Sequence, residues 1–133
     1  MKLTHASGYA LAALVHMARQ PAGERLASHV TAAARGVPEK YLLKLLKSLV
    51  SAGILKSVKG PNGGYRLARA PKDITLLEVV EAVDGPIRGD APAVGRGGAA
   101  ALDRRLQQMC DEAAALAHER LAKVTLAELA KGK

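Results

Sequence analysis

The sequence predicts a mainly α-helical fold with one small β-hairpin. Its 133 residues suffice for one domain with a single core and an appended helix. The chain contains neither Phe nor Trp and only three Tyr, and a core built from Ala and Leu favours closely packed helices over a large sheet. Apolar residues recur at helical spacing in several segments, whereas strand-like alternation flanks a single Gly-rich turn at residues 60–64.

The first two predicted helices span Ser7–Gln20 and Arg25–Arg35. The first is apolar on nearly all sides, which indicates a helix buried between other elements. A Pro-Ala-Gly run at 21–23 separates the two helices, and Gly36 closes the second. Because Pro38 opens another helix at once, two helices are joined by a short Gly-containing turn. Such a turn is typical of a helix-turn-helix, although many helical pairs share it.

A third helix is expected over residues 38–52. Pro38 suits a first turn, where its missing N–H costs nothing, and Gly53 suits the left-handed position that follows a helix. One side carries leucines at helical spacing, namely Leu42, Leu45, Leu46 and Leu49. The opposite arc carries Lys40, Tyr41, Lys44 and Lys47. Such a helix, with one inward side and an outer row of cations, is suited to lie along a polyanion.

The next stretch predicts a β-hairpin over residues 54–69. In the first strand, Ile54, Lys56 and Val58 alternate with Leu55, Ser57 and Lys59, which is the periodicity of a strand. A Gly-Pro-Asn-Gly-Gly turn follows, and Tyr65–Arg69 returns as the second strand. The turn lacks the Gly-Lys-Ser/Thr ending of a phosphate-binding loop and joins two strands, which argues against a nucleotide site. A hairpin directly after a helix-turn-helix forms a wing. Its tip, nearly free of side chains, can enter a narrow groove with Lys59 beside it.

A short helix and a connection follow the wing. Thr75 and Glu78 are expected to form a capping box. The apolar side of the helix after it comprises Leu76, Val79, Val80 and Val83. Five glycines and two prolines between residues 85 and 98 indicate a flexible connection.

The last long helix is expected over residues 99–123 and carries a heptad seam. Steps of four and three join Leu102, Leu106, Met109, Ala113 and Leu116. About 25 residues at about 1.5 Å each give roughly 37 Å, more than a small domain needs to cover itself. We therefore expect pairing with a second copy; packing on its own domain is the alternative. The predicted organisation is a winged helix-turn-helix domain at 1–84, the connection at 85–98, and a dimerisation helix with a short terminal helix at 99–133.

The positive charge is concentrated in one part of the chain. The formal net charge is +8. Residues 35–72 contain nine cations and one acid, a surplus of eight, while the remaining 95 residues carry eleven charges of each sign. A basic segment on an otherwise neutral chain indicates a polyanion partner. A basic surface that is merely solvated is the alternative.

The sequence offers little for catalysis, metal binding or membrane insertion. No nucleophile, base and orienting residue form a recognisable motif, so we expect no enzymatic activity. A single cysteine, Cys110, excludes an intramolecular disulfide and fits a reducing compartment. The apolar N-terminal stretch is too short to span a bilayer, so we expect a cytoplasmic protein without a membrane partner. The histidines lack metal-ligand spacing and lie at His5, His16, His29 and His118.

Five segments resemble the Rrf-two family of winged-helix repressors, which includes regulators of iron–sulfur clusters, nitric-oxide response and cysteine metabolism. They are MKLT…GYALAAL, YLLKLLKSLVSAGILKS, KGPNGGYRLA, ITLLEVVEAVDG and VTLAELA, in family order. The resemblance implies a homodimeric transcriptional repressor on a near-palindromic double-stranded DNA operator, with helix 38–52 in the major groove and wing 54–69 in the minor groove. Together with the cations above, it makes the candidate DNA-binding residues Lys2, Thr4, Glu39, Lys40, Tyr41, Lys44, Lys47, Ser57, Lys59, Gly60, Pro61 and Gly63.

One departure from the family bears on sensing. Sensing members carry three closely spaced cysteines between the fourth helix and the dimerisation helix, whereas region 85–98 has none. Cys110 alone cannot hold an iron–sulfur cluster, so we predict no cofactor and no metal. Cys110 is a candidate redox residue, although the neighbouring Asp111 and Glu112 favour an inert thiol. A small-molecule effector near 85–98, and an RNA or an acidic protein as partner in place of DNA, are open alternatives.

Overall fold

The computed structural model describes residues 2–25, 36–61, 63–94 and 100–132 and confirms a mainly α-helical chain with an antiparallel hairpin. Its elements are α1 (His5–Ala18), α3 (Glu39–Ser51), β1 (Leu55–Val58), β2 (Gly64–Leu67), the 3-10 helix η1 (Pro71–Asp73), α4 (Leu76–Asp84), α5 (Ala100–Ala122) and α6 (Leu126–Lys131). Apart from Arg25, the helix expected over 25–35 lies outside the described residues. No helix in the described ranges is both long and apolar enough for a membrane crossing.

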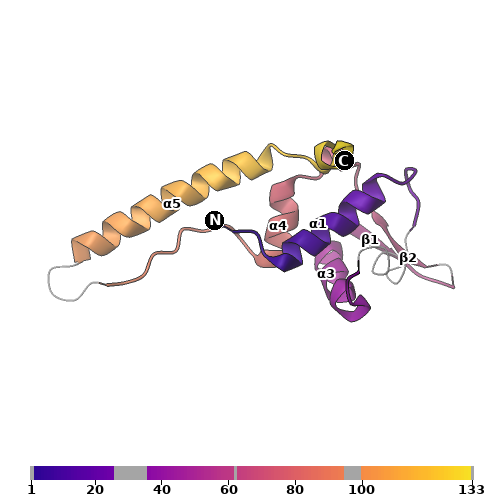
Figure 1. Cartoon of the computed structure of the whole chain (residues 1–133), viewed down its shortest axis with the longest axis horizontal. Coiled ribbons are helices and arrows are strands. Elements are labelled where there is room, and N and C mark those ends of the chain that lie inside the picture. Colours follow the sequence, from indigo (N-terminus) through magenta and orange to yellow (C-terminus); the bar gives the residue numbers. More distant parts are fainter. Residues whose placement is uncertain (1, 26–35, 62, 95–99, 133) are drawn as a thin grey trace.

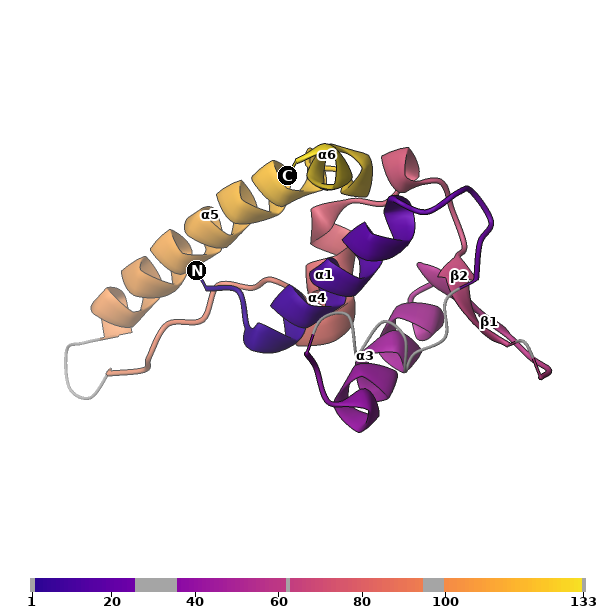
Figure 2. The same cartoon turned by 45° about the vertical axis from the view of Figure 1, so that its right-hand side comes forward.

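The molecule consists of a compact body and a projecting arm. Figure 1 shows α1, α3, α4 and the hairpin grouped at one end, while α5 extends away from them. The described segment before α5 runs alongside that helix, and α6 returns the chain to the body against α1 (Figure 2). The core therefore lies in the body, and much of α5 is left uncovered.

The core forms where α1 and α3 meet α4 and the base of the hairpin. The four leucines predicted to face inward from α3 are buried, with exposed fractions of 6% or less. Burying a leucine is worth about 1.5–3 kcal/mol, so this stripe decides how α3 is rotated. The core cluster comprises Ala10, Ala13, Leu14, Met17, Val37, Leu42, Leu46, Leu49, Ile54, Leu55, Ile74, Val79 and Leu126.

Gly53 turns the chain from α3 into the hairpin. Its φ of +77° is the left-handed conformation expected after this helix. The N–H of Ile54 then donates to the carbonyl of Leu49 at 3.0 Å. Within the hairpin, Leu55 lies opposite Leu67. The hairpin is therefore anchored to the last turns of α3.

The start of α4 follows the prediction only in part. The Thr75 hydroxyl accepts a hydrogen bond from the N–H of Glu78 at 3.1 Å, as expected for an N-cap. The reciprocal half of the capping box is wrong, because the Glu78 carboxylate accepts from Arg69 instead. The predicted apolar stripe also needs correction: Leu77 is buried and Leu76 only half-buried, since α4 packs against α1, α3 and α5 at once.

The start of α6 is paired with the start of α4. The N–H of Leu76 donates to the carbonyl of Val124, and the N–H of Leu126 donates to the carbonyl of Ile74, each at 2.8 Å. Thr125 also caps α6 by accepting from the N–H of Glu128 at 3.2 Å. These bonds fix the C-terminal end of α5 to the body.

The connection predicted as flexible runs, in its described part at 85–94, as an extended strap along α5 (Figure 1). Side chains of α4 and α5 form hydrogen bonds with the backbone of the strap. The Gln107 side chain accepts from the N–H of Ala91 (3.3 Å) and donates to the carbonyl of Gly89 (2.9 Å). The carboxylates of Glu81 and Asp103 accept from the N–H groups of Ile87 (3.1 Å) and Val94 (2.8 Å), respectively. A Cβ at Gly89 would collide with the backbone of Cys110 and Asp111. The glycine at this position thus permits direct contact between the strap and the helix.

Asp84 joins the end of α4 to the start of α1. Its carboxylate accepts hydrogen bonds from the hydroxyls of Thr4 and Ser7, both at 2.6 Å. Ser7 is fully buried, so Asp84 provides the acceptor that this hydroxyl would otherwise find in water. Since Thr4 also caps α1 and Asp84 ends α4, the carboxylate fixes α1 at the point where the strap begins.

Replacing Asp84 should therefore destabilise the body. We expect Asp84→Ala to lower the free energy of unfolding in urea by about 1–2 kcal/mol, because the Ser7 hydroxyl stays buried without an acceptor. Adding Ser7→Ala should recover part of the loss, since the orphaned group is then removed. The matched control, Asp90→Ala at an exposed strap position, should change the value by less than about 0.5 kcal/mol. Equal stability of Asp84→Ala and the unsubstituted protein would contradict this role.

Candidate nucleic-acid interface

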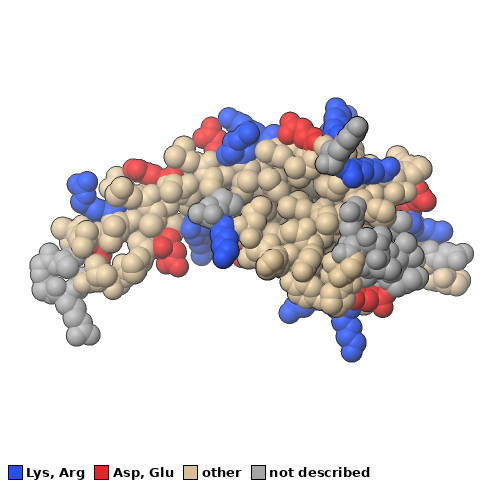
Figure 3. Space-filling model, in the orientation of Figure 1, with Lys and Arg blue, Asp and Glu red and all other residues tan. Residues whose placement is uncertain are grey.

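The outward side of α3 is basic because its inward side is apolar. Lys40, Lys44 and Lys47 are all exposed, opposite the buried leucines. Figure 3 shows Lys and Arg side chains projecting from the lower edge of the molecule, where α3 lies in Figure 1. The hairpin beside it adds three exposed cations, Lys56, Lys59 and Arg66. We refer to these six residues as the basic set.

The basic set is not neutralised within the described chain. The ion pairs found among the described residues are Arg69 with Glu78 and Lys123 with Glu119, and neither involves the basic set. Arg69, which contributes to the surplus counted in the sequence, is thus satisfied internally; its hydrogen bond to Glu78 raises the pKa of the guanidinium above its usual value. The described part of this surplus that remains exposed and unpaired consists of the basic set and Lys72, which lies in η1 outside α3 and the hairpin.

The hairpin tip has little side-chain bulk. Gly60 has a φ of +108°, a conformation that L side chains rarely adopt. The N–H of Gly63 donates to the carbonyl of Gly60 at 2.9 Å, and a Cβ at Gly63 would collide with the carbonyl oxygen of Val58. The turn therefore requires glycine at both positions. Lys59 and Pro61 are exposed at the tip, and Ser57 is exposed on β1.

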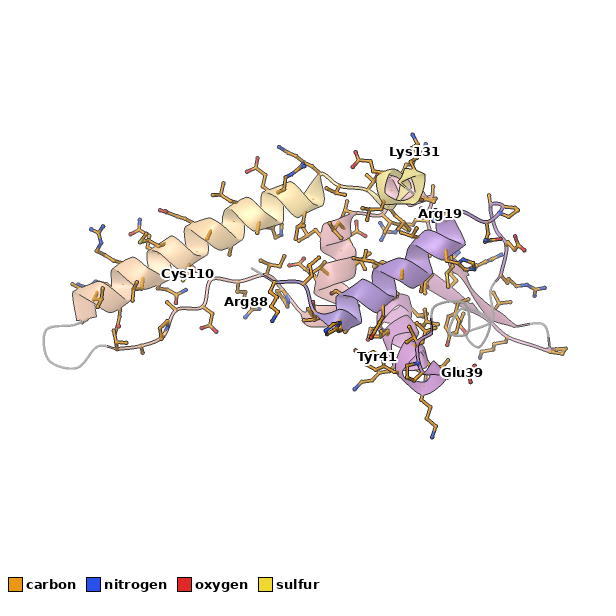
Figure 4. All side chains as sticks on the ribbon, in the orientation of Figure 1. Arg19, Glu39, Tyr41, Arg88, Cys110 and Lys131 are labelled. Carbon is orange, nitrogen blue, oxygen red and sulfur yellow. The ribbon has the colours of Figure 1, made fainter. Side chains whose placement is uncertain are left out.

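Tyr41 lies at the first turn of α3, where it contacts α1. Figure 4 shows it near Glu39, which is exposed in the same turn. The ring of Tyr41 meets the ring of Tyr9 edge to face, with centroids 5.7 Å apart and planes at 89°. Tyr9 was not among the residues predicted from the sequence. Its spacing of four from His5, whose ring centroid lies 6.2 Å away, was the signal available on α1.

The two N-terminal candidates, Lys2 and Thr4, lie apart from the hairpin, at the start of α1 (Figure 1). The Thr4 hydroxyl is engaged with Asp84 and the N–H of Ser7. Lys2 is exposed and lines a groove of about 400 Å³ together with Asp84, the strap and α5. The candidates on α3 and the hairpin thus lie on packed elements, whereas Lys2 and Thr4 lie at the start of α1, next to the groove beside the strap.

Cys110 is half-buried in the wall of the same groove (Figure 4). In the described ranges, no three His, Cys, Asp or Glu side chains gather as metal ligands would. The strap beside Cys110 contains neither Cys nor His. Thiolate donors for an iron–sulfur cluster are thus limited to this one residue, and three or four are needed. The residues present do not fit a cluster.

Comparison with known proteins relates the chain to transcriptional regulators. Residues 3–132 match the model of the Rrf2 family, described as iron-dependent transcriptional regulators. A Rhodobacter capsulatus protein named as an rrf2-like HTH-type transcriptional regulator is 34% identical over 113 residues, which are 83% of this chain and 69% of that protein. The HTH-type transcriptional regulator IscR of Cereibacter sphaeroides is 36% identical over 100 residues, 74% of this chain and 64% of that protein.

A solved structure extends the likeness to the whole fold. The structure of CymR, named as the global cysteine regulator of B. subtilis, superposes with a TM-score of 0.76 at 25% identity. The match covers 98% of this chain and 96% of CymR. The body, the hairpin and the long α5 therefore recur together in another member of this group of regulators.

Proposed function

The chain belongs to the Rrf2 family of transcriptional regulators, and on this premise we propose that it is a homodimeric repressor of transcription that binds a specific double-stranded DNA operator. The observation that carries the proposal is the basic set, exposed on α3 and the hairpin and without an ion-pair partner among the described residues. Binding to a DNA operator would place the protein in the cytoplasm.

In this proposal α3 lies in the major groove. Its lysines neutralise phosphates, which supplies affinity that is independent of sequence and sensitive to salt. The helix, EKYLLKLLKSLVS, contains no Arg, Asn or Gln, the residues that read bases by paired hydrogen bonds. Glu39 and Lys40 are exposed side chains of its first turn that can meet a base edge. Direct reading of bases is therefore limited to few contacts.

The hairpin, as the wing, lies in the neighbouring minor groove. A tip that requires glycine at Gly60 and Gly63 can approach the floor of a narrow groove without side chains in the way. Lys59 then meets the negative potential that narrow minor grooves concentrate. Because α3 reads few bases, sequence-dependent groove width at the wing carries a large share of the specificity.

Two copies pair through α5. Leu102, Met109 and Leu116, at heptad spacing, have exposed fractions of 49%, 60% and 68%. Large apolar side chains in a regular row on one helix favour a partner helix over contact with water. Pairing of the arms leaves both bodies free, so that two α3 helices can address two half-sites of a near-palindrome.

The proposed regulator works without an iron–sulfur cluster, although its family is described as iron-dependent. The support is the donor set: Cys110 is the single cysteine of the sequence. Its position on α5, next to the seam residue Met109, gives it a packing role in place of a ligating one.

The basic set should determine DNA affinity. We expect Lys44→Glu with Lys59→Glu to abolish detectable binding of a labelled duplex at physiological salt. Replacing the two lysines by Ala should lower the slope of log affinity against log salt by about two, because two phosphate contacts are lost. Lys72→Glu with Lys131→Glu makes the same charge change away from α3 and the hairpin and should bind nearly as the unsubstituted protein does. Loss in both double variants would contradict the assignment, and displacement of the duplex by RNA would favour an RNA partner.

The seam on α5 should hold the dimer. Sedimentation equilibrium should show a dimer for the unsubstituted protein and a monomer for Met109→Glu with Leu116→Glu, since two carboxylates per chain would be buried between the helices. Ala101→Glu, on the same helix but off the seam, should stay dimeric. A monomeric unsubstituted protein, or a dimer that survives both seam substitutions, would refute this pairing.

The absence of a cluster can be tested by absorption. Protein purified without oxygen should show the 280 nm tyrosine band and no broad band in the visible range, because Cys110 alone cannot ligate a cluster. Cys110→Ser should leave the spectrum unchanged. A visible band that the serine variant lacks would show that the cysteine ligates a chromophore.

A further inference from the structure

We propose that Tyr9 of α1 is a positioning residue for DNA binding, because its edge-to-face contact holds Tyr41 in the orientation in which the Tyr41 hydroxyl meets a DNA phosphate. This inference rests on the proposed function and deepens it. It adds to the proposed DNA-binding surface a residue that lies outside both α3 and the hairpin.

The geometry of the contact is specific. The ring planes of Tyr9 and Tyr41 meet at 89° with centroids 5.7 Å apart, the T-shaped arrangement that aromatic pairs prefer. His5, four residues before Tyr9 on α1, tilts over Tyr9 at 6.2 Å and 30°. The three rings form a row that runs from the start of α1 to the first turn of α3, so Tyr41 is supported from one side.

The pair lies at the surface and is not part of the core cluster. Both tyrosines have exposed fractions of 37%, whereas the α3 leucines that form the core are exposed by 6% or less. Neither tyrosine hydroxyl takes part in a hydrogen bond with another described residue. A hydroxyl that lies on the same turn as Lys40 and has no hydrogen-bond partner within the described ranges can contact a phosphate.

Support from Tyr9 changes the cost of binding. An unsupported tyrosine on a helix surface samples several rotamers, and fixing it against a ligand costs conformational entropy. With Tyr9 in place, that cost is met when the protein folds. Removing the support should weaken DNA affinity by roughly two- to tenfold, the equivalent of immobilising one side chain at an interface.

A direct contact between Tyr9 and DNA would also lower affinity when lost, so the test must separate the two roles. Tyr9→Phe keeps the ring and removes the hydroxyl; it should bind within roughly twofold of the unsubstituted protein if the ring is what matters. Tyr9→Leu removes the aromatic contact and should show the full loss. The same Tyr9→Leu change in a Tyr41→Leu background should cause no further loss, because there is no longer a ring to position.

The experiment is a double-mutant cycle on the full chain: unsubstituted, Tyr9→Leu, Tyr41→Leu and the double variant, with Tyr9→Phe as the conservative arm. Affinity is measured by anisotropy of a labelled duplex of mixed sequence at low salt, and thermal unfolding is recorded for each protein. Should Tyr9→Leu unfold near the assay temperature, Tyr9→Met takes its place with the same expected values.

Each outcome decides the matter. Unchanged affinity of Tyr9→Leu, an equal loss in both Tyr41 backgrounds, or a loss in Tyr9→Phe as large as in Tyr9→Leu would overturn the positioning role while leaving DNA binding intact. An unsubstituted protein that binds no duplex would overturn the proposed function, and this inference with it. A loss confined to the background that retains Tyr41, restored by Tyr9→Phe, is the expected result.

Discussion

Burial of one side of α3 determines what its other side can do. Leu42, Leu46 and Leu49 have exposed fractions of 1% or less. Rotating the helix by two residues, about half a turn, would replace these three leucines in the core with Lys40, Lys44 and Lys47. Each buried charge would cost several kcal/mol. The direction of the lysine arc is therefore set by the hydrophobic core before any ligand is present. Ile54 and Leu55, fully buried at the base of the hairpin, fix the wing to the same core. Both basic elements thus belong to one rigid unit.

The features that could be predicted from the sequence are those with a local cause. Helical spacing predicted the leucine stripe of α3, Gly53 its end, and Thr75 the start of α4, and all three are confirmed. The predicted role of Glu78 in the capping box was wrong. Its carboxylate can accept a hydrogen bond either from a backbone N–H at the start of its own helix or from a cation, and it accepts from Arg69, nine residues away. Local periodicity carries no information about such choices between segments.

In the candidate site too, features with a local cause could be predicted from the sequence, whereas contacts between distant segments could not. Exposure of the predicted lysines follows from the α3 pattern, and their roles toward DNA stay predictions. The contact between Tyr9 and Tyr41 joins residues 32 positions apart and needs the crossing of α1 over α3, which no spacing within either helix specifies. The strap is a second example. Its glycines are typical of a flexible linker, yet Gly89 brings backbone against backbone beside Gln107, a contact that depends on where α5 lies.

A continuous series of contacts links the α5 arm to the first turn of α3. The strap begins after Asp84, whose carboxylate holds Thr4 and Ser7; His5 follows Thr4 and starts the row of rings that ends at Tyr41. Continuity alone is not coupling, which requires an element with two arrangements. None of the strap residues at 85–94 is buried, and polar side chains hold the segment. Segments with few buried apolar contacts open at the lowest free energy. Of the elements in this series, the strap can therefore change its arrangement at the least cost to the core.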